Sequence, residues 1–167
     1  MAGTISRLWA HARTGTGVVR RRFDHEAMER IREAIVAAER GHAGEVRFAV
    51  EAALPIGKLR QHRDARSRAL EVFSQLRVWD TEENTGVLLY LLWADRAIEI
   101  VADRGIAALV PASAWEAVCT EISDGLRSTH PVDAVIAGIA RIGELLRAAL
   151  PARESTPDEL PDDPAVL

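Results

Sequence analysis

The chain has 167 residues, of which 48% are hydrophobic and 28% are charged, and its formal net charge is −4. These values predict one soluble globular domain, large enough to bury a core without disulfides or a structural metal. Its single cysteine, Cys119, excludes an internal disulfide and a zinc site built from cysteines, which favours a reducing compartment.

The two ends of the chain carry opposite charge. Residues 1–22 contain several arginines and no acidic residue, and residues 4–12 have apolar side chains at helical spacing. We expect a basic amphipathic extension that either packs on the domain or makes a weak contact with an anionic membrane. We do not expect nucleic acid as a partner. Residues 151–167 combine prolines and acids with little apolar content, which predicts a disordered acidic tail.

Residues 23–150 alternate between helical and strand patterns. We expect a helix over residues 24–40, a strand over 45–53, a helix over 58–76 and a strand over 86–94. This order is a βαβ unit, so the two strands should lie parallel. No signal-peptide pattern and no apolar run of about 20 residues is visible, so we expect a cytoplasmic protein.

A β-hairpin is predicted at the centre of the chain. Asp95 and Arg96 reverse the apolar strand 86–94 into a second strand over residues 97–102. The first strand is apolar on both faces, as expected where helices cover both sides of a sheet. Two further helices are expected from Ser113 and Pro131. We therefore predict an α/β fold, a three-layer sandwich with a small mixed sheet of three to four strands flanked by helices.

Several short motifs, in this order and spacing, resemble those of the TPM domain family and most of all its cytosolic bacterial branch: residues 42–45, 69–73, 79–82, 84–88, 94–96 and 98–106. The resemblance covers residues 23–150 and implies an α/β sandwich. A plant member of this family is associated with acid phosphatase activity and binding of divalent cations. Bacterial members often occur beside LemA-type membrane proteins, which implies a membrane-linked partner.

The strand directions bring acidic residues from three chain segments to one end of the predicted sheet. Carboxylate and amide oxygens suit a hard cation such as Ca²⁺ or Mg²⁺. The predicted ligands are Glu45, Asp80, Glu83, Asn84 and Asp103. Arg104 follows directly and could bind phosphate through a bidentate pair.

Simpler roles for these residues stay open. Asp80 or Asn84 can cap the local turn, and Asp103 and Arg104 can pair with each other. The opposite end of the sheet offers a further anion pocket, formed by Glu51, Asp95, Arg96 and the helix start near His62, or only a solvated turn.

The predicted function is that of an accessory or binding module, able to bind a divalent cation and linked to the maintenance of membrane proteins. One alternative is a weak metal-assisted acid phosphatase. Another is a membrane-peripheral adaptor that uses residues 1–22. The sequence shows no nucleophile or poised histidine beside the acidic loop, which favours binding over catalysis.

Overall fold

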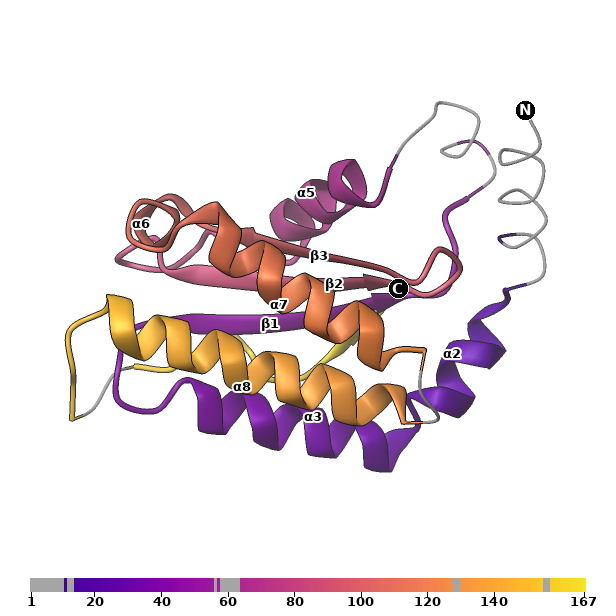
Figure 1. Cartoon of the computed structure of the whole chain (residues 1–167), viewed down its shortest axis with the longest axis horizontal. Helices are drawn as coiled ribbons and strands as arrows, with labels where there is room; N and C mark the ends of the chain where they lie inside the picture. Colours follow the sequence, from indigo (N-terminus) through magenta and orange to yellow (C-terminus); the bar gives the residue numbers. More distant parts are fainter. Residues whose placement is uncertain (1–10, 12–13, 56, 58–63, 128–129, 155–156) are drawn as a thin grey trace.

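The structure is a computed structural model that describes residues 11, 14–55, 57, 64–127, 130–154 and 157–167. At its centre lies a four-stranded mixed sheet with the strand order β3-β2-β1-β4 (Figure 1). The strands are β1 (Glu45–Glu51), β2 (Gly86–Leu92), β3 (Ala97–Ala102) and β4 (Ala165–Val166). β1 and β2 are parallel, and β3 returns antiparallel to β2. The predicted βαβ unit and antiparallel hairpin are therefore confirmed.

Helices cover both faces of this sheet (Figure 1). They are α2 (Thr16–Arg22), α3 (His25–Ala38), α5 (Ala65–Gln75), α6 (Arg104–Ala107), α7 (Ala112–Gly125) and α8 (Pro131–Ala149). α3, α7 and α8 pack together on one face, while α5 lies on the other. The predicted three-layer sandwich is confirmed. Among the described residues, no helix combines the length and the apolar character needed to cross a membrane.

Alternation along the strands divides the core in two. On β1, Val46, Phe48 and Val50 face α3, α7 and α8 and belong to the larger cluster of buried side chains. On β2, Leu88 and Tyr90 point to the opposite face and pack with α5. β2 is buried along its whole length, which explains why its sequence shows no polar face.

The helix starts follow local sequence signals. Asp24 caps α3 by accepting a hydrogen bond from the N–H of Ala27 at 2.9 Å, and Asp64 caps α5 in the same way. Of the predicted helix 58–76, residues Ala65–Gln75 form α5, and residues 58–63 lie outside the described part of the chain. α7 begins at Ala112, directly after Pro111, without a side-chain cap. The capping box expected from Ser113 is not formed, because the helix already starts before it.

Near the N-terminus, α2 belongs to the folded domain. Val19 and the following Phe23 are buried in the larger core. The predicted amphipathic helix over residues 4–12 lies outside the described residues, except for His11.

The C-terminal tail differs from the disorder expected of it. Residues 157–167 run along the free edge of β1, where β4 pairs in parallel with that strand. The N–H of Leu167 donates to the carbonyl of Val50 at 2.9 Å, and Leu160 is buried in the core beneath α5. A proline-rich, acidic composition disfavours helix, but this segment gains its order from a few apolar side chains and from backbone pairing with the sheet.

Candidate functional site

The acidic loop, the end of β3 and the start of β1 meet at one end of the sheet. The N–H of Asp103 donates to the carbonyl of Gly86 at 2.9 Å, and the N–H of Glu45 donates to the carbonyl of Thr85 at 3.3 Å. Three segments that are distant in sequence therefore share one rim, as alternating strand directions require.

Asn84 has a conformational role at this rim. Its φ angle is 56°, a left-handed value that asparagine tolerates better than most residues. Its carbonyl accepts a hydrogen bond from the N–H of Gly105 at 2.9 Å. A Cβ atom at Gly105 would lie 2.3 Å from the carbonyl oxygen of Glu83, so this close approach of the loop to α6 requires glycine.

Asp103 acts as the N-cap of α6. Its Oδ1 accepts a hydrogen bond from the N–H of Arg104 at 2.7 Å. The side chain is buried, and no described residue donates to its Oδ2. Arg104 is exposed.

Glu45 and Glu83, two of the other predicted ligands, have partners of their own. The carboxylate of Glu45 is buried and accepts a hydrogen bond from the N–H of Leu160 in the tail at 3.3 Å. Glu83 forms an ion pair with Arg153, and Asp80 is exposed. Within the described part of the chain, no group of three or more His, Cys, Asp or Glu side chains is arranged to hold a metal ion.

Glu45 lies in a cleft between the domain and the tail, here called the acidic cleft. Its volume is about 460 Å³. Most of the charged residues that line it are acidic. They are Glu39 and Glu45 from the domain and Glu154, Asp158 and Asp162 from the tail, beside Arg40 and Arg153. The sequence pattern does not reveal this cleft, because the composition of the tail predicts disorder and gives its acidic residues no neighbours.

Burial and mutual repulsion raise the pKa of Glu39 and of Glu45. Burial raises the pKa of Glu39 to about 9, with the charges of Glu45 and Asp162 adding to the effect. Burial likewise raises the pKa of Glu45 to about 7, with contributions from Asp158 and Glu159. A side-chain hydrogen bond between Glu39 and Asp162 also raises the pKa of Glu39. At a pH between the unfolded-state and folded-state pKa values, Glu39 and Glu45 therefore hold protons in the folded protein that they lose in an unfolded chain.

We expect the stability of the fold to fall as pH rises from about 4.5 to about 9, because the folded state holds a proton on Glu39 that the unfolded chain has lost. The Glu39→Gln variant keeps an oxygen to accept the 2.7 Å hydrogen bond from the N–H of Val46 but stays neutral. The free energy of unfolding of this variant should equal that of the wild type near pH 4.5 and exceed it near pH 9. Urea unfolding across this range measures the difference.

The matched control is Glu33→Gln, which removes one charge from an exposed position of α3, the helix that Glu39 follows as C-cap. Its stability should follow the wild-type pH dependence. The prediction would be contradicted if the stability of the wild type and that of Glu39→Gln changed with pH in the same way.

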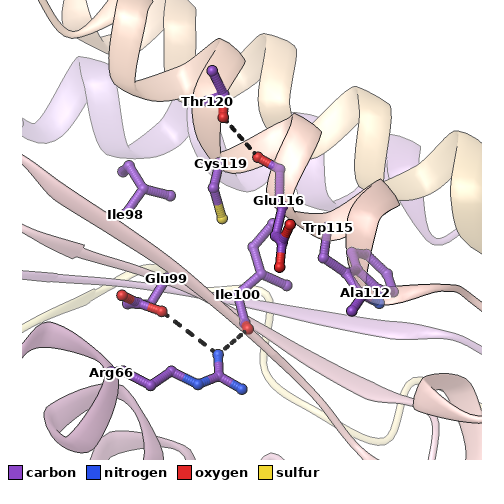
Figure 2. Close-up of a pocket in the computed structure, with 9 residues that line it drawn as sticks. All are labelled: Arg66, Ile98, Glu99, Ile100, Ala112, Trp115, Glu116, Cys119 and Thr120. Atoms are coloured by element: carbon purple, nitrogen blue, oxygen red, sulfur yellow. Dashed lines mark hydrogen bonds and ion pairs between the residues drawn. The ribbon is translucent and has the colours of Figure 1, made fainter.

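A second hollow, the β3 groove, lies along the outer edge of β3 between α5 and α7 (Figure 2). Arg66 of α5 donates to the carbonyl of Ile100 and lies 3.6 Å from the carboxylate of Glu99. From α7, Trp115 and Cys119 line the opposite wall. Burial raises the pKa of Cys119 to about 11, so the thiol is neutral at physiological pH, and its lining role is that of a small apolar group.

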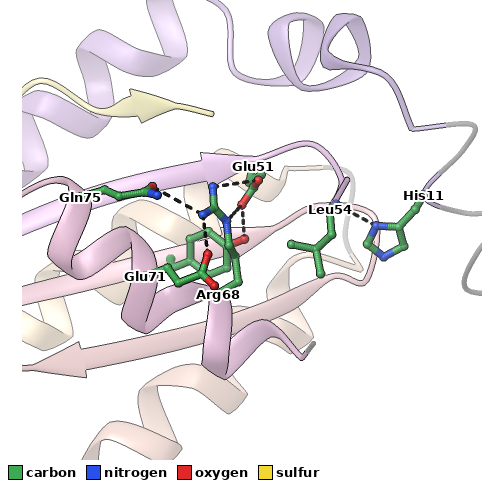
Figure 3. A network of polar contacts seen from close by, with 7 residues as sticks. His11, Glu51, Leu54, Arg68, Glu71 and Gln75 are labelled. Carbon is green, nitrogen blue, oxygen red and sulfur yellow. Dashed lines mark hydrogen bonds and ion pairs between the residues drawn. The ribbon is translucent and has the colours of Figure 1, made fainter. Parts of the chain in front are cut away.

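At the other end of the sheet, Glu51 is held in a buried network (Figure 3). Arg68 donates to its carboxylate through Nε at 2.7 Å and Nη2 at 3.2 Å, and the hydroxyl of Tyr90 donates at 2.6 Å. Burial and the bond to Glu51 raise the pKa of Tyr90, which keeps the hydroxyl protonated as a donor. With these partners Glu51 has a structural role, and the predicted anion pocket does not include it as a free group.

The turn at this end is tied to the N-terminal region. His11 is buried and bonds through Nε2 to the carboxylate of Asp95 at 2.8 Å. Its Nδ1 accepts a hydrogen bond from the N–H of Leu54 at 2.9 Å (Figure 3). Arg96 has a φ angle of 50° and stacks on the ring of Trp93. His62 lies outside the described residues.

Comparisons with known proteins identify the family of this fold. The model of the TPM domain matches residues 21–145, from the end of α2 into α8. Among solved structures, the chain is similar to the NMR structure of the BA42 protein from the psychrophilic bacterium Bizionia argentinensis sp. nov., with a TM-score of 0.74 and 27% identity over 84% of this chain and 92% of that chain. No curated protein matches the sequence. The chain belongs to the TPM domain family.

Proposed function

We propose that this chain is an accessory binding module whose acidic cleft takes a divalent cation, Ca²⁺ or Mg²⁺. The supporting observation is that Glu39 and Glu45 of the domain face Asp158 and Asp162 of the tail in one cleft, with raised pKa values for Glu39, Glu45 and Asp158. Crowded carboxylates favour a neutralising charge, which protons supply below the raised pKa values and which a hard cation with oxygen ligands supplies when it displaces those protons.

Ion binding then couples the tail to the domain. No described group of acids is already spaced as a ligand set, so a cation would have to draw the tail carboxylates toward Glu45. Of the ligands predicted from sequence, Glu45 is the one that lines this cleft. Asp80, Glu83, Asn84 and Asp103 stay predictions for a separate rim site, as does Arg104 for phosphate.

The cellular role that we propose rests on family resemblance. A membrane-linked protein of the LemA type is the proposed partner, with the basic residues 1–22 adding a weak contact to anionic lipid. The proposed location is cytoplasmic. A weak acid phosphatase is the alternative, in which the cation would polarise a phosphoryl oxygen and activate water.

Thermal unfolding in the presence of CaCl₂ or MgCl₂ at neutral pH tests the cation proposal. A ligand that binds only the folded state at about 100 times its Kd adds about 2.7 kcal/mol, which raises the Tm of a chain of this length by several degrees. We expect this increment in the wild type and a smaller one in Glu45→Gln and Asp162→Asn. Glu33→Gln, an exposed charge change on α3, serves as the control.

Two results would count against the proposal. One is a wild-type Tm that neither cation changes, and the other is an equal increment in Glu45→Gln and Glu33→Gln. The same protein samples, assayed with a generic phosphate ester at acidic pH, separate binding from catalysis. Hydrolysis that requires the cation and Glu45 would favour the phosphatase.

A further inference from the structure

We propose that the β3 groove is a docking site for an extended polypeptide segment of another protein, which pairs with β3 as an additional strand. This function is separate from the acidic cleft. It rests on the backbone of β3, on the shape of the groove and on the charges at its two ends.

The backbone of β3 presents hydrogen-bonding groups on its outer side. Asp103 donates its N–H to Gly86 of β2, and residues alternate along a strand, so Ile98, Ile100 and Ala102 direct their N–H and C=O groups away from β2. Arg66 donates to the carbonyl of Ile100, and the thiol of Cys119 contacts the backbone of the same residue, so Ile100 is already engaged from both sides. No described residue bonds to the N–H or C=O of Ile98. An edge with unpaired groups of this kind is a template for strand addition.

The groove continues along the strand beyond the part drawn in Figure 2. Two adjoining hollows of about 570 and 370 Å³ share Ile98, Cys119 and Thr120 as lining residues. Helices α5 and α7 flank β3 on opposite faces of the sheet. A single extended segment fits between such walls. A second copy of the domain fits less well, because its own β3 carries the same two helices.

The opposite edge of the sheet already accepts an extended segment. There the tail adds β4 beside β1, and backbone pairing is accompanied by burial of Leu160. The β1 edge is therefore covered within the chain, while the β3 edge has no described strand beside it. This difference points to β3 as the edge that is open to a partner.

Charges at the two ends of the groove indicate the chemistry of the segment. Arg66 is close to Glu99, and Arg127 pairs with Asp124 at 2.8 Å. Among the described residues, Glu116 at one end and Arg96 at the other have no ion-pair partner, and both line the groove. The segment that fits best carries a basic side chain near Glu116 and a carboxylate near Arg96, with an apolar residue between them.

Selection of displayed random peptides of about ten residues, somewhat longer than β3, against the full chain tests this proposal. We expect enrichment of alternating sequences with a lysine or arginine toward one end. In NMR spectra of the chain, a synthetic peptide from the selection should shift the amide signals of Ile98 and Ile100. N-methylation of alternate peptide nitrogens should remove binding, because it removes the strand donors.

Variants keep the test specific. Thr120→Arg places a long side chain in the groove and should weaken binding by at least about tenfold, whereas Ser113→Arg changes the same helix outside the groove. Glu116→Lys should disfavour basic peptides and recover binding when their basic residue is exchanged for glutamate. The proposal is overturned if no peptide is enriched on the wild type relative to Thr120→Arg, if N-methylated peptides bind equally well, if the amide shifts map elsewhere, or if the groove instead joins two copies of the chain.

Discussion

Replacing Arg68 by methionine is expected to lower the free energy of unfolding by about 3 to 5 kcal/mol, the usual result of removing one partner of a buried ion pair. Arg68 is a buried residue of α5 and supplies two of the hydrogen bonds that Glu51 accepts, at 2.7 and 3.2 Å. Without it, the buried carboxylate keeps only the hydroxyl of Tyr90 as a described donor. Urea unfolding measures the loss.

The size of this effect depends on the charge left behind in the core. The double variant Arg68→Met with Glu51→Leu removes both charges and should recover much of the lost stability. Arg32→Met serves as the control, because Arg32 pairs with Glu29 at the surface of α3 and such pairs contribute little. A double variant as unstable as Arg68→Met, or a large loss in the control, would show that packing and not the unpaired carboxylate sets the cost.

This network also shows which part of the fold was predictable. The alternation of Glu45, Arg47 and Glu51 with apolar residues correctly predicted a strand with one polar face. All three polar side chains are nevertheless buried. Their partners come from α5 and from the tail, and no local pattern specifies contacts between segments so far apart in sequence. Period and length predict strands, but they do not identify what covers a polar face.

At the rim at the other end of the sheet, the meeting of the strands was likewise predictable from the sequence, and the contacts of the side chains were not. Strand directions were sufficient to predict that the acidic loop, Asp103 and the start of β1 would meet. The orientation of their carboxylates was not predictable, since it depends on the α6 cap at Asp103 and on the contact of Glu45 with Leu160. The tail was assigned disorder from its composition, and β4, with two residues, is too short to show a period. The acidic cleft could therefore not be predicted from the sequence.

The C-terminal tail contributes both to the edge of the sheet and to the acidic cleft. It lies outside the part of the chain that the TPM domain model matches, and yet it covers the β1 edge and supplies acids to the cleft. Arg47 is buried against it and donates to the carbonyl of Pro161. Cation binding and tail docking should therefore be measured on the full chain, because a shorter chain trimmed to the matched residues would lose the acidic cleft and expose the β1 edge.

Gly86→Ala is expected to destabilise the fold by about 3 kcal/mol or more, at the upper end of the cost of overpacking. An ideal Cβ at this position would lie 1.9 Å from the carbonyl oxygen of Val78, which belongs to the backbone and cannot rotate away. The carbonyl of Gly86 also accepts the 2.9 Å hydrogen bond from Asp103, so a shift of β2 at its first residue would disturb the whole rim.

Chemical denaturation of Gly86→Ala beside Gly17→Ala tests this argument. A Cβ at Gly17 in α2 meets no atom within 4 Å, and alanine there should leave stability unchanged or raise it by up to about 1 kcal/mol, because alanine favours helix. If the two variants unfold at the same denaturant concentration, β2 does not need to approach Val78 so closely. A loss confined to Gly86→Ala, with amide shifts spreading to Asp103 and Asn84, would instead identify this contact as the one that fixes the rim.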